Sequence, residues 1–127
     1  MSSNTTDGAA ILVVEDFEDT RLMVKMQLQV RGYRVIEADN GEAAGEVALR
    51  ERSDLILMDL SLHVFDGLTA IRRIRQHPGM EDVPIIAVTA YEEEHLEAEC
   101  REAGCTAYIK KPADIDMLVK IMNQFSN

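Results

Sequence analysis

The chain has 127 residues and a net charge of −10 at pH 7, from 13 lysines and arginines against 23 aspartates and glutamates. So acidic a chain is unsuited to binding nucleic-acid phosphates or an anionic membrane surface, because both are negatively charged. No apolar stretch approaches the roughly 20 residues that a membrane-spanning helix needs. We therefore expect one domain with its own core over residues 9–127, preceded by a short disordered tail over residues 1–8.

The amino-terminal segment and the cysteines indicate the compartment. Residues 1–8 lack the basic and apolar regions of a signal peptide, which favours a reducing cytoplasm. Cys100 and Cys105 are five residues apart, and this spacing matches neither a redox CxxC motif nor a zinc site. We expect both to be ordinary thiols.

Short apolar runs alternate with helical patterns along the whole chain, which is typical of buried parallel strands joined by helices. The five expected strands are residues 10–14, 33–38, 54–58, 84–88 and 106–110. The five expected helices are residues 17–31, a segment beginning at Asp39, a segment from about 66 to 77, residues 91–103, and a segment capped by Asp114. This alternation predicts an α/β fold with helices on both faces of a parallel sheet.

The spacing of apolar residues predicts which helix faces turn toward the core. In the first helix, Leu22, Met26 and Val30 recur at i, i+4 and i+8. In the second helix, Asp39 and Glu42 have the three-residue offset of a capping box. The methionines that fall mostly on apolar stripes are expected in the core: Met23, Met26, Met58, Met117 and Met122. The inward positions of the other four helices are Ala43, Ala44, Val47, Ala48, Leu68, Ile71, Ile74, Leu96, Cys100, Ala103, Leu118, Ile121, Met122 and Phe125.

Polar residues follow four of the expected strands. Glu15 and Asp16 follow the first strand, Asp59 the third and Thr89 the fourth, and the fifth ends in Lys110-Lys111. The carboxyl ends of parallel strands meet at one edge of a sheet, so these side chains are expected to converge. Three carboxylates with a lysine and a hydroxyl suit a hard cation and a phosphoryl group.

This order of residues resembles the response-regulator receiver domain of two-component signalling. The resemblance extends from about residue 9 to 125 and includes Asp66-Gly67 at the start of the third helix, Ala103-Gly104 before the fifth strand, and Lys111 followed by proline. It implies a flavodoxin-like, doubly wound (βα)5 fold with parallel strand order 2-1-3-4-5. One departure is that Leu62-His63 stands where the family commonly has Met-Pro, so we expect a more flexible loop there.

The resemblance also implies a role for each site residue. Asp59 would be the nucleophile and phosphoacceptor. Mg²⁺ would be bound directly by Asp16, by Asp59 and by the backbone carbonyl of Ser61, with Glu15 acting through a coordinated water.

Three more residues complete the implied machinery. Lys111 would pair with a phosphoryl oxygen, because it precedes proline as the family pattern requires, whereas Lys110 would be a surface lysine. A cis peptide bond would join Lys111 to Pro112. Thr89 would donate a hydrogen bond to the phosphoryl group, and Tyr108 would be the aromatic switch residue.

The function implied is a phosphorylation-activated switch that catalyses only its own phosphorylation and dephosphorylation. It would accept a phosphoryl group from a histidine kinase or a histidine phosphotransfer protein. It would then control an unidentified downstream protein through the surface of the fourth helix, fifth strand and fifth helix. The acidic run Glu92-Glu93-Glu94 and the other acidic residues of the fourth helix, such as Glu97 and Glu102, are either a solvated face or part of that surface.

Four alternatives differ in class. The chain could be a receiver domain from a longer response regulator or hybrid kinase. An aspartyl-phosphate phosphatase of the haloacid dehalogenase kind would need an Asp where Ser61 stands. An FMN-binding flavodoxin-like protein would place its phosphate where Glu15 and Asp16 repel it. A degenerate receiver acting as a scaffold would not need the complete set of site residues.

Overall fold

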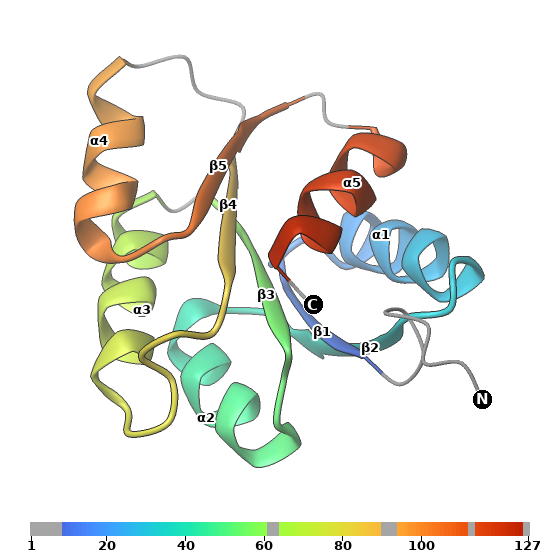
Figure 1. Ribbon diagram of the computed structural model, residues 1–127, viewed down its shortest axis with the longest axis horizontal. Helices are drawn as coiled ribbons and strands as arrows, with labels where there is room; N and C mark the ends of the chain where they lie inside the picture. Colours follow the sequence, from blue (N-terminus) through green and yellow to red (C-terminus); the bar gives the residue numbers. More distant parts are fainter. Residues whose placement is uncertain (1–8, 61–63, 90–93, 112–113, 126–127) are drawn as a thin grey trace.

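The computed structural model describes residues 9–60, 64–89, 94–111 and 114–125. In this part of the chain, strands and helices alternate from end to end (Figure 1). The strands are β1 (Ala10–Val14), β2 (Arg34–Ala38), β3 (Leu55–Asp59), β4 (Ile85–Thr89) and β5 (Ala107–Lys110). The helices are α1 (Glu18–Val30), α2 (Gly41–Glu51), α3 (Val64–Gln76), α4 (Glu94–Ala103) and α5 (Ile115–Phe125).

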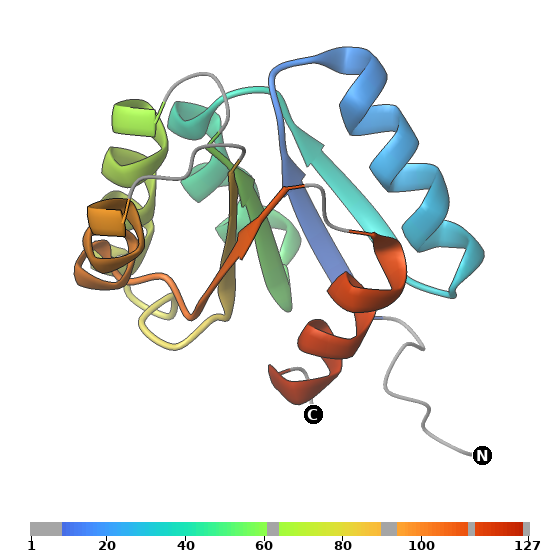
Figure 2. The ribbon, with the colours of Figure 1, turned by 90° about the horizontal axis from the view of Figure 1, so that it is seen from above.

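The sheet is parallel throughout, with strand order β2-β1-β3-β4-β5, so the predicted fold class and topology are confirmed. Helices α1 and α5 cover one face of the sheet, and α2, α3 and α4 cover the other (Figures 1 and 2). Side chains alternate between the two faces. In β1, Ile11 and Val13 join the core under α1 and α5, whereas Leu12 and Val14 join the core under the other three helices.

Most of the predicted inward faces are confirmed. In α3, Leu68, Ile71 and Ile74 are buried, and the helix begins at Val64, two residues earlier than predicted. In α4 the buried residues are Leu96, Cys100 and Ala103, as predicted. The predicted amino-terminal cap of α5 is also present, because the Asp114 carboxylate accepts a hydrogen bond from the Met117 N–H at 2.7 Å.

The predicted inward face of α1 is wrong. Met26 is 63% exposed and Val30 is 83% exposed, whereas Leu28 is fully buried. The side of α1 near the sheet edge also carries Arg21 and Lys25, which pair with Glu37 of β2. The most apolar stripe of this helix therefore faces outward, because ion pairs to the edge strand occupy part of its inner side.

The prediction for the methionines is correct for only some of them. Met58 and Met122 are buried in the two cores. Met23, Met26 and Met117 are exposed on α1 and α5. A helical apolar stripe alone does not distinguish a face that packs on the sheet from a face that is left on the surface.

The capping box predicted for α2 is also wrong. The cap is Asn40, whose side-chain oxygen accepts a hydrogen bond from the Ala43 N–H at 2.8 Å. Asp39 lies one residue too early to make this bond and instead accepts a hydrogen bond from the Asn40 side chain. The sequence offers two adjacent residues with short polar side chains, and either type can cap a helix.

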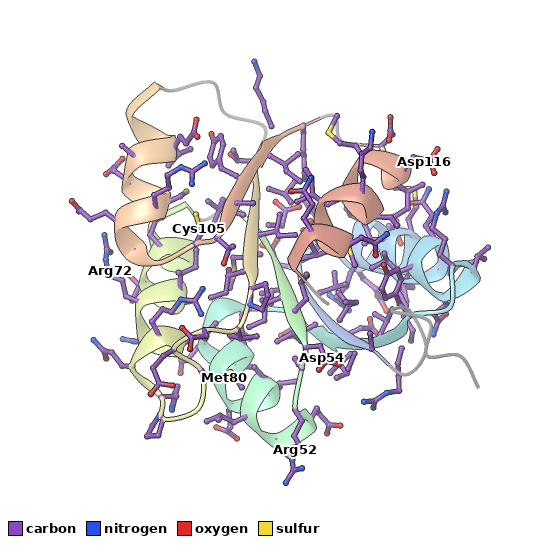
Figure 3. All side chains as sticks on the ribbon, viewed as in Figure 1. Arg52, Asp54, Arg72, Met80, Cys105 and Asp116 are labelled. Atoms are coloured by element: carbon purple, nitrogen blue, oxygen red, sulfur yellow. The ribbon has the colours of Figure 1, made fainter. Side chains whose placement is uncertain are left out.

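The amino edge of the sheet is held by one arginine near the carboxyl end of α3. The Arg75 guanidinium donates to the backbone oxygens of Val83 at 2.6 Å, Gly104 at 2.8 Å and Met80 at 3.0 Å. It also contacts the Thr106 hydroxyl at 3.3 Å. Figure 3 shows two of its neighbours, Met80 and Cys105, on this side of the molecule. Arg75 therefore ties the α3–β4 loop to the turn between α4 and β5.

Candidate functional site

The three predicted carboxylates line one cavity at the carboxyl edge of the sheet. The cavity has a volume of about 260 Å³ and includes Glu15, Asp16 and Asp59 in its lining. Glu15 directly follows β1 and is buried, Asp59 is the last residue of β3, and Asp16 is exposed at the rim. The structure therefore brings together the acidic residues that the sequence placed at two separate strand ends.

Lys111 contacts Asp59, one of the residues that line this cavity. Its Nζ donates to the Asp59 carboxylate at 2.6 Å, and its backbone N–H donates to the Thr89 carbonyl at 2.7 Å. The preceding residue, Lys110, is exposed. The alternation of side chains along β5 thus separates the two lysines as predicted.

The environment of Glu15 is unusual for a carboxyl group. Burial and, to a lesser extent, a hydrogen bond to Asp59 together raise the pKa of Glu15 to about 8. The Phe17 N–H, which donates to the Glu15 carboxylate at 3.0 Å, and the Lys111 ammonium act in the opposite direction. Two carboxyl groups in contact and withdrawn from water favour a shared proton, or a cation in its place.

Thr89 and Tyr108 lie on adjacent strands. Thr89 ends β4 and is fully buried. Tyr108 lies in β5 opposite Ala87 and is partly buried against the core that α2, α3 and α4 cover. The predicted relay therefore has a buried hydroxyl near the site and an aromatic ring at the boundary between core and surface.

The residues present fit a hard divalent cation. Glu15, Asp16 and Asp59 supply only oxygen atoms, which Mg²⁺ prefers, and Mg²⁺ keeps several waters rather than demanding a complete protein cage. In the described part of the chain, no three acidic, histidine or cysteine side chains are already oriented as a metal cluster. In this structure the Asp59 carboxylate accepts a hydrogen bond from Lys111, and the Glu15 carboxylate accepts one from the Phe17 N–H.

Several sequence predictions lie outside the described residues. These are the tail over residues 1–8, the Ser61 carbonyl, the Leu62-His63 departure, the Lys111–Pro112 peptide bond and the acidic residues 92–93.

Sequence analysis missed two features around this site. One is a larger cavity of about 470 Å³ between α1 and α5, which has Met23 and Leu118 in its lining and also reaches Asp59 and Lys111. The other is Arg21, which donates to the Glu15 backbone carbonyl at 2.9 Å. A bond to a backbone carbonyl leaves no signal in the sequence, and the apolar stripe of α1 was assigned to the core.

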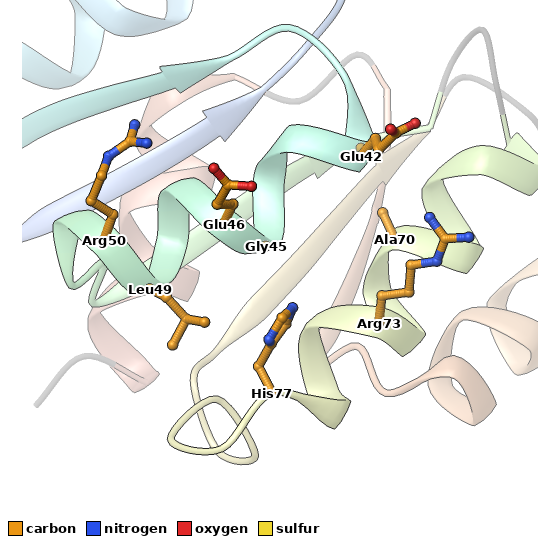
Figure 4. A pocket seen from close by; sticks show the side chains of 9 residues that line it. Glu42, Gly45, Glu46, Leu49, Arg50, Ala70, Arg73 and His77 are labelled. Atoms are coloured by element: carbon orange, nitrogen blue, oxygen red, sulfur yellow. The ribbon is translucent and has the colours of Figure 1, made fainter.

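A separate cavity of about 460 Å³ lies between α2 and α3, where Gly45 allows close approach of His77 (Figure 4). A Cβ atom at Gly45 would lie 3.3 Å from Nε2 of His77. Acidic and basic side chains share the lining, including Glu46 and Arg73. This mixture of charges does not select one class of ligand.

Comparison with known proteins agrees with the fold. The sequence model of the response regulator receiver domain matches residues 11–123. The chain is 31% identical to the polar-differentiation response regulator DivK of Brucella anthropi, covering 91% of this chain and 94% of DivK. The chain therefore belongs to the response regulator receiver domain family and to two-component signalling.

Solved structures show the same relationship. The chemotaxis protein CheY4 of Vibrio cholerae superposes with a TM-score of 0.86 at 28% identity, covering 93% of this chain and 98% of CheY4. The receiver domain of a sensor histidine kinase from Pseudomonas aeruginosa superposes with a TM-score of 0.83 at 37% identity, covering 93% of this chain and 97% of that domain. That receiver domain has a magnesium ion coordinated in its active-site cleft.

No helix in the described part of the chain is both long and apolar enough to span a membrane.

Proposed function

We propose that this protein is a phosphorylation-driven switch whose phosphoacceptor is Asp59. The observation that carries the proposal is the 2.6 Å contact between Lys111 and Asp59, in a cavity that Glu15 and Asp16 also line. A carboxylate oxygen of Asp59 attacks the phosphorus of a phosphohistidine, and the phosphorus–nitrogen bond breaks. The bonding electrons return to the imidazole of the donor, so the products are an aspartyl phosphate and a free histidine.

The chain's own residues reduce the charge repulsion that opposes this attack. Lys111 presents an ammonium group beside Asp59 and can hydrogen-bond a phosphoryl oxygen once the phosphoryl group arrives. Glu15, Asp16 and Asp59, with the Ser61 carbonyl, would hold Mg²⁺, which when bound neutralises phosphoryl charge. The burial of Glu15 also favours cation binding, because two buried carboxylates in contact repel each other when no cation lies beside them.

The phosphoryl signal would leave the site through Thr89 and Tyr108. The buried Thr89 hydroxyl moves toward a phosphoryl oxygen, and the Tyr108 ring moves into the space beside it. Because Tyr108 lies on β5 between the core and the surface, this movement changes the surface formed by α4, β5 and α5. A downstream protein that binds only one form of this surface would be controlled by phosphorylation.

The phosphodonor must cover the cavity edge in order to bring its phosphohistidine to Asp59. The apolar cavity between α1 and α5 opens beside Asp59, and Met23, which lines it, is exposed. We therefore assign this surface to the histidine kinase or histidine phosphotransfer protein that donates the phosphoryl group. A cytoplasmic location remains the prediction from the sequence.

Relatives of this chain occur in two forms. The matched region covers 94% of DivK, so DivK consists of little more than this domain. The match to a cyclic di-GMP phosphodiesterase from Thermotoga maritima, at 35% identity, covers only 31% of that longer protein. The proposed switch serves in either form, as an independent regulator or as the receiver of a longer protein. Its family membership supports this function over an FMN-binding protein or a phosphatase of external substrates.

The proposal is tested by phosphorylating the purified protein with phosphoramidate or acetyl phosphate in the presence of Mg²⁺. Mass spectrometry should detect one added phosphoryl group that hydroxylamine removes, and Asp59→Ala should gain none. Asp54→Ala is the control, because Asp54 lies at the opposite end of β3, where it accepts a hydrogen bond from the Ala10 N–H at 2.7 Å (Figure 3). Full labelling of Asp59→Ala would sink the assignment.

A further inference from the structure

Arg21 of α1 connects the proposed metal site to the edge of the sheet. Its Nη1 donates to the backbone carbonyl of Glu15 at 2.9 Å, and its Nε donates to the Glu37 carboxylate of β2, also at 2.9 Å. Only 14% of the Arg21 side chain is exposed. One guanidinium group therefore bridges the start of the acidic loop and the neighbouring strand.

The loop between β1 and α1 carries Glu15 and Asp16, and its backbone is fixed at several points. The Glu15 N–H donates to the Ala38 carbonyl at 3.1 Å, and the Arg21 N–H donates to the Phe17 carbonyl at 2.9 Å. The Arg21 side chain adds the bond to the Glu15 carbonyl, on the residue that begins the loop. Because the guanidinium group is planar and rigid, it also fixes the direction of that carbonyl.

Glu37 keeps Arg21 in place. Hydrogen bonds from Lys25 and Arg21 hold the pKa of Glu37 below its usual range, so Glu37 is ionised when it holds the guanidinium group. The guanidinium group of Arg21 is therefore anchored by the ion pair to Glu37 of β2, and it donates a second hydrogen bond to the Glu15 carbonyl in the acidic loop.

We propose that Arg21 is a positioning residue for the metal ligands Glu15 and Asp16, acting through the Glu15 backbone without touching the metal or the phosphoryl group. The inference rests on the proposed Mg²⁺ site. Residues that orient metal ligands in this way typically contribute about 10-fold or more to metal affinity.

Charge alone predicts the opposite effect, which makes the role measurable. A guanidinium group near a cation site repels the cation, so removing its charge should tighten Mg²⁺ binding slightly. Removing a positioning bond should weaken Mg²⁺ binding. The direction of the change in affinity therefore distinguishes the two roles.

Lys25 is a matched control. Its Nζ donates to the other Glu37 oxygen at 2.9 Å. Lys25→Gln therefore removes one positive charge that pairs with Glu37, as Arg21→Gln does. Within the described residues, Lys25 makes no hydrogen bond to Glu15. The two variants therefore differ mainly in whether the bond to the Glu15 carbonyl is lost.

The experiment is calorimetric titration of the metal-free full chain with MgCl₂, for wild type, Arg21→Gln, Arg21→Lys and Lys25→Gln. Arg21→Gln should raise the Kd about 10-fold. Lys25→Gln should leave the Kd unchanged or lower it slightly. Arg21→Lys should fall between these values, because an ammonium group keeps the charge but cannot reproduce the planar two-direction contact. Urea unfolding of the metal-free proteins measures whether both glutamine variants lose similar stability.

Each outcome has a defined meaning. Equal Mg²⁺ affinities for Arg21→Gln and Lys25→Gln would overturn the positioning role while leaving the metal site intact. If Arg21→Gln does not fold, the comparison of Arg21→Lys with wild type decides, and an unchanged Kd overturns the proposal. Absence of Mg²⁺ binding by the wild type would overturn both the metal site and the role of Arg21.

Discussion

At the amino edge of the sheet, Arg75 donates to three backbone carbonyls, whereas at the carboxyl edge Glu15 and Asp59 are two carboxyl groups in contact. The first arrangement satisfies fixed backbone acceptors with a permanent charge and needs nothing from outside. The second concentrates like charges that are partly withdrawn from water. The difference agrees with the proposal that one edge contributes stability, while the other is a site for a cation and a phosphoryl group.

The largest expected effect is a slower rate of phosphorylation at the carboxyl edge of the sheet. Lys111→Ala should slow phosphorylation by acetyl phosphate about 10²–10³-fold, because it removes the cation that stabilises the developing charge. Lys110→Ala should retain the wild-type rate, since Lys110 is exposed and its neighbour makes the contact to Asp59. The rate of appearance of phosphoprotein, followed by mass spectrometry, measures both. Equal rates for the two variants would contradict the assignment.

The amino edge should show the reverse behaviour. Arg75→Ala should lower the free energy of unfolding by about 2–4 kcal/mol, because several backbone carbonyls lose their donor. Phosphorylation of the folded fraction should continue at close to the wild-type rate. Urea unfolding monitored by circular dichroism measures the stability, and Arg72→Ala, an exposed arginine on the same helix, is the control. If Arg75→Ala lowered the free energy of unfolding by less than Arg72→Ala does, the backbone carbonyls would have to be satisfied without Arg75.

Mg²⁺ should complete the carboxyl edge and leave the amino edge unaffected. At a free concentration of 100 times the Kd, Mg²⁺ should stabilise the wild type by about 2.7 kcal/mol, by mass action. Arg75→Ala should gain the same increment, whereas Asp59→Ala should gain much less because it lacks one ligand. Thermal unfolding with and without MgCl₂ checks this, and a wild-type curve that does not shift in millimolar MgCl₂ would count against the site.

The smallest expected effect is a pH dependence that arises at Glu15. In the metal-free folded protein, burial and contact with Asp59 raise the pKa of Glu15 from 4.5 to about 8. Between these values the folded state binds more protons than the unfolded chain, so the free energy of unfolding falls as pH rises. From pH 5 to 8 this contribution should be on the order of 1–2 kcal/mol, because Glu15 and Asp59 are in contact and share one proton.

Urea unfolding at several pH values, without Mg²⁺, measures this contribution as the difference between wild type and Glu15→Gln. The amide cannot titrate, so the variant should lack the part of the slope that belongs to Glu15. Parallel curves for the two proteins would refute the shared-proton arrangement of the two carboxyl groups.

The same contrast explains what could be predicted from the sequence. Glu15, Asp59 and Lys111 were predictable because each follows an apolar strand, and parallel strands bring their carboxyl ends to one edge. Arg21 and Arg75 were not predictable, because their partners include backbone carbonyls distant in the sequence, and every residue type has a carbonyl.

The outward face of α1 shows a different limit of sequence analysis. Apolar residues at helical spacing are expected both on a face that packs on a sheet and on a face that binds another protein. Met26 and Val30 were assigned to the core on this pattern, yet both are exposed. The charges of Arg21 and Lys25 on the inner side were the available signal, because they had a partner in Glu37.

The exposed side chains of α1 have a consequence for the conditions under which signalling operates. Met23, Met26 and Val30 carry no charge, and contacts between apolar surfaces are not screened by dissolved ions. If the proposed phosphodonor extends from the cavity between α1 and α5 onto this face, that part of the contact should change little with ionic strength, even though the chain has a net charge of −10. A partnership of this kind would keep its affinity when the salt concentration of the surroundings rises or falls.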